Sequence, residues 1–404
     1  MNGKILKRIY CNYLTSIEVF ILALIYSYVI MKIILAPDKF KGSLTGTQFC
    51  NAVEEGVKSV LPNAEIVKLP LADGGDGTIE ILEYHLKGER VIVKVNDPLF
   101  RDIEASYLYM DSIKTAFIEM AAASGMYLLK REEQNCYNTT TFGTGELILD
   151  AINKGAKTII LGIGGSATND CGMGMATAMG YKFEDEHGNE LVPIGKNLSQ
   201  LKVINSSYVM GALKSIDFKV ACDVTNPMHG EQGAAYVYGP QKGASPDEIK
   251  ALDEGLKNIS KLFKKQFDRD VQNIKGAGAA GGMGAGTSVF LNAELKSGND
   301  LVKNLVAFDE KIKGADWIIT GEGKLDSQTL SGKTIDGVIT SAKKQNIPVA
   351  ALCGSISLSK TEADALGLSY TDAVMEKAKS LEDAMQNGYD YVKKMAINFA
   401  KTIA

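Results

Sequence analysis

The stretch Lys157–Gly174, KTIILGIGGSATNDCGMG, runs from apolar residues directly into a turn of glycine and small polar residues. Residues 158–163 are mostly apolar and predict a buried strand. Gly162, Gly164 and Gly165 let backbone N–H groups approach a ligand where a Cβ would block them. A turn of this kind can bind a phosphate, although the same pattern also fits a tight strand-to-helix turn without a ligand.

The polar residues of this stretch add possible ligand groups. Ser166 and Asn169 are neutral hydrogen-bonding groups, and Asp170 adds a carboxylate that could hold a divalent cation. Residues 173–179 predict the start of a helix, so the polar side chains lie between a strand and a helix. We therefore predict an anion or metal site at this turn.

Composition limits the class of protein. The chain has 404 residues, of which 45% are hydrophobic and 23% charged, and this is enough material for two α/β domains. The net charge of −4 argues against a nucleic-acid partner, which normally requires a basic surface. The six cysteines form no CxxC pair, so they predict neither a disulfide framework nor a zinc site. Reduced thiols in a cytoplasmic protein are expected.

The first thirty residues have a different character. Lys4, Lys7 and Arg8 precede an apolar run over residues 19–30, which superficially resembles a signal peptide or an anchor. The run is shorter than the about 20 apolar residues of a membrane-spanning helix. We predict that residues 1–30 are an extension outside the fold, with no membrane partner unless the extension is a true anchor.

A charged loop follows the first strand predicted after this extension. Residues 32–36, KIILA, predict a strand, and the loop PDKFKGSLT precedes a helix predicted over 45–60. Open α/β sheets bind ligands beyond the carboxyl ends of their strands, so Lys39 and Lys41 are candidates for binding anionic oxygens. The same residues also fit a solvated loop that caps a helix.

A second loop of this kind follows the strand predicted over residues 65–69. The string PLADGGDGT places Asp73, Gly75 and Asp76 at the strand end. Backbone amides beside carboxylates suit phosphate and Mg²⁺ together, whereas the alternative is a simple turn before a helix.

The middle of the chain differs from its flanks. Residues 90–109 alternate around Asp97 and Pro98, which predicts an antiparallel hairpin. A strand predicted over 218–222 ends at Asp223. The string GAGAAGGMGAG, residues 276–286, is too rich in glycine for a regular element and predicts a ligand loop or a joint between domains.

The carboxyl-terminal part returns to alternating strands and helices, with a strand over 316–320 that ends in GEGKLD. We therefore predict an α/β protein with a discontinuous Rossmann-like parallel-sheet domain, residues 31–90 plus 298–404. An inserted α/β domain with a mixed sheet, residues 91–297, interrupts it. The ligand is expected in the cleft between the two domains.

Motif tests leave one other enzyme class open. Gly332, Lys333 and Thr334 do not form a Walker A motif, because Ser327 stands where its first glycine should be. The spacing from Gly162 to Ala167 fits a relaxed dinucleotide fingerprint, and Glu184 follows about twenty residues later, where a ribose-binding acid is expected. No GxSxG motif or paired Cys and His supports nucleophilic catalysis. An NAD-dependent 2-hydroxy-acid dehydrogenase therefore stays an alternative.

Several long strings occur in an order that resembles the bacterial glycerate kinase family, of the type that phosphorylates the 2-hydroxyl. They are APDKFKGSLT, PLADGGDGT, GIGGSATNDCGMGM, ACDVTNP, YGPQKGA, GAGAAGGMGAG and TGEGKLDSQTLSGKT. The resemblance covers residues 31–404 and implies an ATP-dependent kinase for D-glycerate, with a Rossmann-like domain interrupted by a second α/β domain. The chain departs from the family at Lys39, which is commonly serine, and at Cys171, which is commonly glycine.

Phosphoryl transfer requires donors and cations around phosphates, carboxylates for Mg²⁺ and an acid that accepts the hydroxyl proton. Our predicted nucleotide- and phosphate-binding residues are Asp73, Gly75, Gly164, Gly165, Ser166, Asn169, Gly321 and Glu322. Asp76 and Asp170 are predicted metal ligands, and Lys41 is predicted to bind anionic oxygens. Asp223 and Asp326 are the candidate bases, of which we favour Asp223.

The assignments above leave several points open. A non-catalytic protein that binds sugar acids remains a second alternative to the kinase. The sequence does not decide between the 2- and the 3-hydroxyl as acceptor, although 2-phosphoglycerate is favoured. It also leaves the oligomeric state open.

Overall fold

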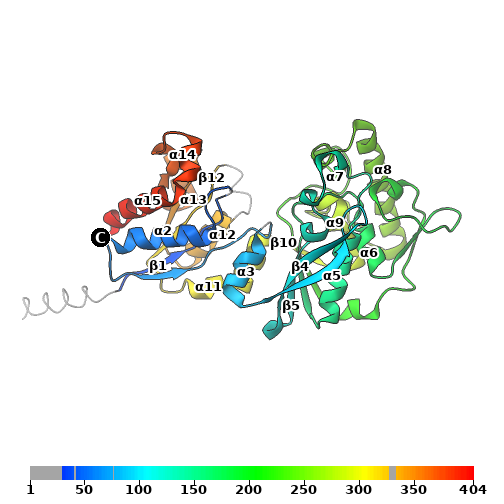
Figure 1. Cartoon of the computed structure of the whole chain (residues 1–404), viewed down its shortest axis with the longest axis horizontal. Helices are drawn as coiled ribbons and strands as arrows, with labels where there is room; N and C mark the ends of the chain where they lie inside the picture. Colours follow the sequence, from blue (N-terminus) through cyan, green and yellow to red (C-terminus); the bar gives the residue numbers. More distant parts are fainter. Residues whose placement is uncertain (1–29, 41, 76, 327–333) are drawn as a thin grey trace, which may run out of the picture. The chain divides into compact units, whose positions relative to one another are not determined.

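The computed structural model describes residues 30–404 except 41, 76 and 327–333, and these residues form two compact units (Figure 1). Unit 1 comprises residues 30–70, 310–326 and 338–404, and unit 2 comprises residues 71–309 and 334–337. The prediction for the amino-terminal extension falls almost wholly outside the described residues. Within the described residues, no helix is long and apolar enough to cross a membrane.

Unit 1 is built on a parallel sheet of five strands in the order β15-β13-β11-β1-β2. The strands are β1 (Lys32–Leu35), β2 (Glu65–Lys68), β11 (Trp317–Thr320), β13 (Val349–Cys353) and β15 (Leu368–Ala373). In the inner strand β1, Ile34 lies between Val67 and Ile318, and it is completely buried. An apolar strand with no exposed face is typical of a parallel sheet.

Two helices of unit 1 pack closely on each other and cover the sheet. They are α2 (Gly46–Lys58) and α15 (Gly388–Ile403), which form one core with Ile33 and Leu35. A Cβ at Gly56 would lie 2.5 Å from the carbonyl oxygen of Lys393, so glycine permits this approach. The other helices of unit 1 are α12 (Thr334–Lys344), α13 (Lys360–Leu366) and α14 (Leu381–Gln386). The terminal helix predicted from Leu381 is therefore two helices, α14 and α15, separated at Asn387.

The chain reverses its direction across the unit 1 sheet between β1 and β11. From β1 it proceeds to β2 at one edge, whereas β11, β13 and β15 follow one another toward the other edge. The amide of Asp38 donates to the carbonyl oxygen of Gly321 at 2.8 Å, so the loops after β1 and β11 are directly joined. Open α/β sheets bind their ligands at such a point.

Unit 2 contains a mixed sheet of six strands in the order β10-β9-β6-β5-β4-β3. The strands are β3 (Glu89–Asn96), β4 (Asp102–Met110), β5 (Thr115–Glu119), β6 (Thr158–Gly162), β9 (Asp217–Ala221) and β10 (Glu294–Lys296). The pairs β3–β4 and β4–β5 are antiparallel, and the remaining pairs are parallel. The predicted fold class, a parallel sheet plus a mixed sheet, is confirmed, and so is the hairpin around Asp97 and Pro98. The predicted domain boundaries at residues 91 and 297 stay a prediction.

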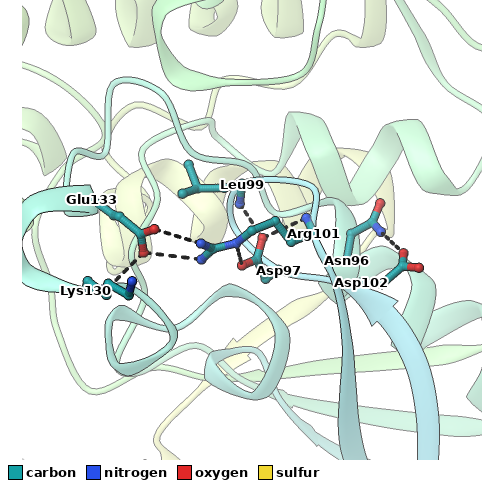
Figure 2. Close-up of polar contacts among 7 residues, drawn as sticks. All are labelled: Asn96, Asp97, Leu99, Arg101, Asp102, Lys130 and Glu133. Atoms are coloured by element: carbon teal, nitrogen blue, oxygen red, sulfur yellow. Dashed lines mark hydrogen bonds and ion pairs between the residues drawn. The ribbon is translucent and has the colours of Figure 1, made fainter.

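A buried carboxylate holds the turn of this hairpin (Figure 2). Asp97 is 2% exposed and accepts hydrogen bonds from the amides of Leu99 and Arg101. The guanidinium of Arg101 donates to Asp97 at 2.6 Å and to Glu133 at 2.8 Å. These contacts order the turn, since the charge of Asp97 has both backbone and guanidinium donors.

The helices of unit 2 are α3 (Thr78–Leu86), α4 (Ala121–Ser124), α5 (Phe142–Asn153), α6 (Met173–Ala178), α7 (Ala234–Tyr238), α8 (Pro246–Phe267), α9 (Ala279–Phe290) and α10 (Gly298–Leu305). Most of them share one large core with the mixed sheet, whereas α3 and α10 contact each other and the strands β4 and β9. A short separate sheet pairs β7 (Lys182–Glu184) with β8 (Val203–Asn205). Helix α8 begins at a capping box in which Ser245 and Glu248 bond reciprocally, and this explains its start.

The glycine-rich string 276–286 is irregular as far as Gly282 and regular helix from Met283, so the prediction that it forms no regular element is wrong only for its second part. Helix α9 contains Ala280, Gly281 and Gly282 in left-handed conformation and then continues as a regular helix. A Cβ at Gly281 would lie 2.2 Å from the carbonyl oxygen of Thr168, and one at Gly286 would lie 2.0 Å from that of Cys171. The glycines therefore permit close packing on the turn after β6. Cys171 itself has a φ of 55°, a conformation that favours the glycine common in the family.

Candidate active site

A cavity of about 460 Å³ opens within unit 2, and we call it the unit 2 pocket. Its walls come from the loop before α3, the turns after β6 and β9, the segment after α7 and the start of α9. The lining residues are Asp73, Gly74, Gly75, Met126, Ile163, Gly164, Gly165, Ser166, Ala221, Cys222, Asp223, Val224, Tyr238, Gln241, Lys242, Ala279 and Ala280. Because β6 and β9 are neighbouring parallel strands, their carboxyl ends and the following turns meet at this pocket.

Glycines bring two of these walls into direct contact. A Cβ at Gly162 would lie 2.7 Å from the carbonyl oxygen of Gly74, and one at Gly74 would lie 2.7 Å from the Cα of Gly298. Gly74 also has a φ of 83°, which side chains rarely adopt. The loop before α3 thus lies against the turn after β6 with no room for side chains between them, which aligns the predicted residues Asp73 and Gly75 with that turn.

The turn after β6 presents backbone donors to the unit 2 pocket. Within the described chain, the amides of Gly164, Gly165 and Ser166 donate to no protein acceptor. Gly165 has a φ of 71°, a turn conformation that lets successive amides converge. Three unpaired N–H groups at a pocket wall can bind an anion, which is the chemistry predicted for these residues.

Asp223 lies two residues after the end of β9 and lines the unit 2 pocket. Its Oδ1 accepts a hydrogen bond from the amide of Gly298 at 3.1 Å, at the start of α10. Although solvent reaches this residue, the surrounding protein removes much water from its carboxylate. This desolvation, together with the nearby charge of Asp73, raises the pKa of Asp223 to about 6, and the Gly298 amide only partly offsets it. A carboxylate with this pKa can accept a proton at neutral pH.

Asp73 is the second acid of the unit 2 pocket. It is half-buried, and its Oδ1 accepts a hydrogen bond from the amide of Gly75 at 3.0 Å. In kinases Mg²⁺ is bound by one or two carboxylates and by the phosphates of the substrate, so Asp73 fits such an ion. Among the described residues, no group of three or more His, Cys, Asp or Glu side chains could hold a metal alone. The predicted metal ligand Asp76 lies outside the described residues.

Asp170, the other predicted metal ligand, lies beneath the turn and does not line the pocket. It is fully buried, and its Oδ2 accepts from the amide and hydroxyl of Thr141, both at 2.8 Å, and from the amide of Gly174. Its Oδ1 accepts from the amide of Gly172. Burial raises the pKa of Asp170, and these four donors lower it. With four protein donors, the geometry favours a structural role over metal binding, and its predicted role as a metal ligand stays untested.

Asn169 is also buried beneath the turn, at 1% exposure, and is not part of the pocket wall. Its side-chain nitrogen has no hydrogen-bond partner within the described part of the chain, and neither has the hydroxyl of Thr168. Its predicted phosphate contact therefore stays a prediction. The turn 166–170 thus combines one residue that lines the pocket, Ser166, with four buried residues that do not.

Lys242 is a functional candidate that our sequence reasoning missed. Its Nζ donates to the hydroxyl of Ser166 at 2.7 Å and to the carbonyl oxygen of Thr168 at 2.8 Å. Burial lowers the pKa of Lys242 to about 8. The only signal in the sequence was its place in the string YGPQKGA, because nothing local predicts that a lysine after Pro240 is buried.

The remaining predicted residues belong to unit 1. Gly321 and Glu322 follow β11 directly, and Glu322 is buried. A Cβ at Gly321 would lie 2.1 Å from the carbonyl oxygen of Leu352, so this turn requires glycine. Asp326 forms an ion pair with Lys324 at 3.1 Å, and Lys41 lies outside the described residues. The roles predicted for these residues stay predictions.

A second, apolar cavity of about 130 Å³ lies at the carboxyl edge of the unit 1 sheet, and we call it the unit 1 pocket. Residues after β1, β11, β13 and β15 contribute to it, together with α14 and α15. They are Phe40, Ser43, Leu44, Gly323, Gly354, Ser355, Val374, Met375, Leu381, Ala384, Met385, Gly388 and Val392.

Comparisons with known proteins show the family of this chain. The family model described as "Glycerate kinase family" matches residues 33–404. The chain is 44% identical to a glycerate kinase of Halalkalibacterium halodurans, over 91% of this chain and 97% of that protein. It is 42% identical to glycerate 2-kinase of Escherichia coli K12, over 93% and 98%. The crystal structure of a protein provisionally named glycerate kinase 2, from Salmonella typhimurium LT2, matches with a TM-score of 0.83 and 40% identity, over 93% of this chain and 98% of that one.

Proposed function

The chain belongs to the glycerate kinase family and is a kinase that acts on glycerate, and from this premise we propose that it transfers the γ-phosphoryl group of ATP to D-glycerate. We propose the 2-hydroxyl as the acceptor, so that the product is 2-phosphoglycerate. The relative named glycerate 2-kinase supports this choice.

The observation that carries this proposal is the position of Asp223 in the unit 2 pocket, beside a turn with three unpaired amides. Asp223 accepts the proton of the substrate hydroxyl while that oxygen forms a bond to the γ-phosphorus. The bond between this phosphorus and the bridging oxygen of ADP breaks, and ADP leaves with the electron pair. A pKa of about 6 keeps Asp223 ionised at pH 7 and raises its basicity above that of an ordinary aspartate.

Backbone amides at the same pocket support charge stabilisation. Negative charge on the transferred phosphoryl group is spread over three oxygens, and donors fixed in advance stabilise it without reorganisation. The amides of Gly164, Gly165 and Ser166 are donors of this kind. Among the described residues Asp73 best fits a Mg²⁺ ion bound with ATP, which would supply positive charge to the phosphate oxygens.

The unit 1 pocket supports a nucleotide as the phosphoryl donor. It lies beyond the carboxyl ends of parallel strands, where the strand order reverses. Phe40, Leu44 and Val374 make its wall apolar, and an apolar slot of this size suits one flat ring system. We propose that it accepts the base of ATP, and that Gly321 and Glu322 belong to the same nucleotide site. The interdomain cleft predicted from the sequence stays a prediction.

The dehydrogenase alternative has no support at the position on which it depends. It requires Glu184 at the end of a strand next to the Gly162 turn. Glu184 instead ends β7, which pairs with β8 in a separate sheet. The dinucleotide spacing at Gly162–Ala167 therefore lacks its acidic partner.

One coupled assay tests the proposed function. The full chain, D-glycerate and Mg·ATP are expected to release ADP, and NMR is expected to identify 2-phosphoglycerate as the product. Omission of Mg²⁺ should abolish the reaction, and NAD⁺ in place of ATP should yield no change in absorbance. Exclusive formation of 3-phosphoglycerate would refute the proposed acceptor, and absence of ADP release would refute the kinase itself.

A further inference from the structure

A lysine lines the unit 2 pocket with almost no exposure to solvent. Lys242 ends the short helical turn Pro240–Lys242, between α7 and α8, and it is 5% exposed. Lysine is rarely buried to this degree unless its charge is paired, because transfer of an ammonium group out of water is unfavourable. Its position at a pocket wall therefore requires an explanation.

The protein partners of this ammonium group are neutral. They are the hydroxyl of Ser166 and the carbonyl oxygen of Thr168. Within the residues that the structure describes, no carboxylate forms an ion pair with Lys242, and Asp170 acts on it only from farther away. An ammonium group has three donors, so one remains after these two bonds. The fold thus presents a cation whose direct counter-ion is missing.

The other polar groups of the pocket indicate which anion fits. Asp223, the proposed base, also lines the pocket and favours a neutral group that donates a proton, such as a hydroxyl. The amides of Gly164 and Gly165 offer an uncharged anion site for the phosphoryl group. A small molecule that carries both a carboxylate and a hydroxyl matches Lys242 and Asp223 together.

We propose that Lys242 binds the carboxylate of the acceptor substrate and thereby selects a hydroxy acid over an uncharged polyol. This inference rests on the proposed function of the unit 2 pocket. Ser166 acts as a positioning residue, because its hydroxyl accepts from Nζ and holds the ammonium group before substrate arrives. A cation held in this way loses little conformational freedom on binding, which favours affinity.

The test compares Lys242→Met with Lys250→Met in the full chain. Methionine keeps much of the length of lysine and removes its charge, and Lys250 is an exposed lysine of α8 outside the pocket. In Lys242→Met we expect KM for D-glycerate to rise about 100-fold, because a charge-assisted contact is lost, and KM for ATP to change little. The preference for D-glycerate over glycerol, expressed as the ratio of the two kcat/KM values, should also fall about 100-fold. Lys250→Met should resemble the wild type in each value.

Several outcomes overturn the inference. An unchanged KM for D-glycerate in folded Lys242→Met would refute it, and so would a rise confined to KM for ATP, which would assign Lys242 to the nucleotide phosphates. A fall in kcat alone would assign it to the transferred group.

Calorimetry with D-glycerate and glycerol, without ATP, separates this inference from the proposed function. If the wild type binds D-glycerate through Lys242 but releases no ADP, the kinase fails and the carboxylate site stands. If Lys242→Met does not fold, Ser166→Ala provides the test, with an expected rise of about 5-fold in KM for D-glycerate from the loss of one positioning bond. An unchanged KM in Ser166→Ala would then refute the inference.

Discussion

Asp170 and Asp223 follow neighbouring parallel strands of unit 2, β6 and β9, but one carboxylate is buried and the other faces a pocket. Asp170 accepts hydrogen bonds from four donors, which join the start of α6 to the segment before α5. Asp223 accepts one from the Gly298 amide and retains oxygens for a ligand. The difference teaches that only an acid whose oxygens the protein leaves unsatisfied is available to a ligand.

The electrostatic surroundings extend this comparison. Burial raises the pKa of both acids, but only Asp223 also has a second carboxylate, Asp73, at the same pocket. The donors around Asp170 stabilise its charge where no substrate reaches it. Asp223 is therefore expected to govern the reaction, and Asp170 the stability of the turn beneath it.

The largest expected effect is on catalysis. Asp223→Asn should lower kcat about 100-fold or more at saturating Mg²⁺, because the amide cannot accept the hydroxyl proton. Steady-state kinetics measures kcat, and nucleotide binding should stay near that of the wild type. Asp326→Asn in unit 1 is the matched variant, since Asp326 was the other candidate base. A kcat close to that of the wild type in Asp223→Asn would place the base elsewhere.

Asp170→Asn tests the buried half of the comparison. The substitution replaces a carboxylate oxygen that accepts hydrogen bonds with an amide NH2 group that cannot accept them, so we expect the free energy of unfolding to fall by about 3 kcal/mol. Chemical denaturation with urea measures this loss. Asp223→Asn is the control, and its unfolding midpoint should lie close to that of the wild type. If the two variants are equally stable, the hydrogen bonds around Asp170 do not stabilise the fold as described.

Two glycines sharpen the same contrast between turn and pocket. A Cβ at Gly174 would lie 2.2 Å from the hydroxyl oxygen of Thr140 and 2.5 Å from the amide nitrogen of Phe142, close to the Asp170 contacts. Gly174→Ala should therefore destabilise the protein by about 2 kcal/mol. At Gly164 the nearest atom is the Cα of Gly75, at 3.7 Å.

Gly164→Ala should accordingly keep its stability and lose affinity, because its methyl group enters the unit 2 pocket. We expect KM for substrate to rise about 10-fold, by about 1.4 kcal/mol of binding free energy. Thermal unfolding and kinetics of both variants measure the two effects. A stable Gly174→Ala variant together with an unstable Gly164→Ala variant would reverse the comparison.

The smallest expected effect concerns pH. Because the pKa of Asp223 is raised to about 6, kcat/KM should fall as pH decreases through about 6, where the base becomes protonated. An ordinary aspartate would place this limb near pH 4. A pH profile of the wild type measures it, and the residual activity of Asp223→Asn should lack it. A limb near pH 4 in the wild type would contradict the raised pKa.

The same shift has a consequence for stability. A pKa raised in the folded protein means that the fold binds this proton more tightly than the unfolded chain does. The stabilising contribution of the protonated form is present below about pH 4 and is lost as pH rises through about 6. Asp223→Asn should thus be at least as stable as the wild type at pH 8.

Features that depend on neighbouring residues were predictable from the sequence. The alternating residues around Asp97 and Pro98 predicted the hairpin of β3 and β4, and the apolar run before Gly162 predicted β6. Asp223 was predicted at a strand end, and the structure has it two residues after the end of β9. These predictions succeed because hydrophobic periodicity and turn residues act within one segment.

What the sequence by itself determined is therefore the α/β alternation, the glycine turns and the acids and amides at strand ends, since each is encoded over a few residues. Only the tertiary structure decided that Asp170 is buried while Asp223 faces a pocket, and that Lys242 reaches Ser166, 76 positions away in the chain. It also decided that the glycine-rich segment becomes regular helix from Met283, with glycines that make room for the backbone of Thr168 and Cys171. Burial, pKa and hydrogen-bond partners depend on distant segments that pack together, and no local pattern contains that information.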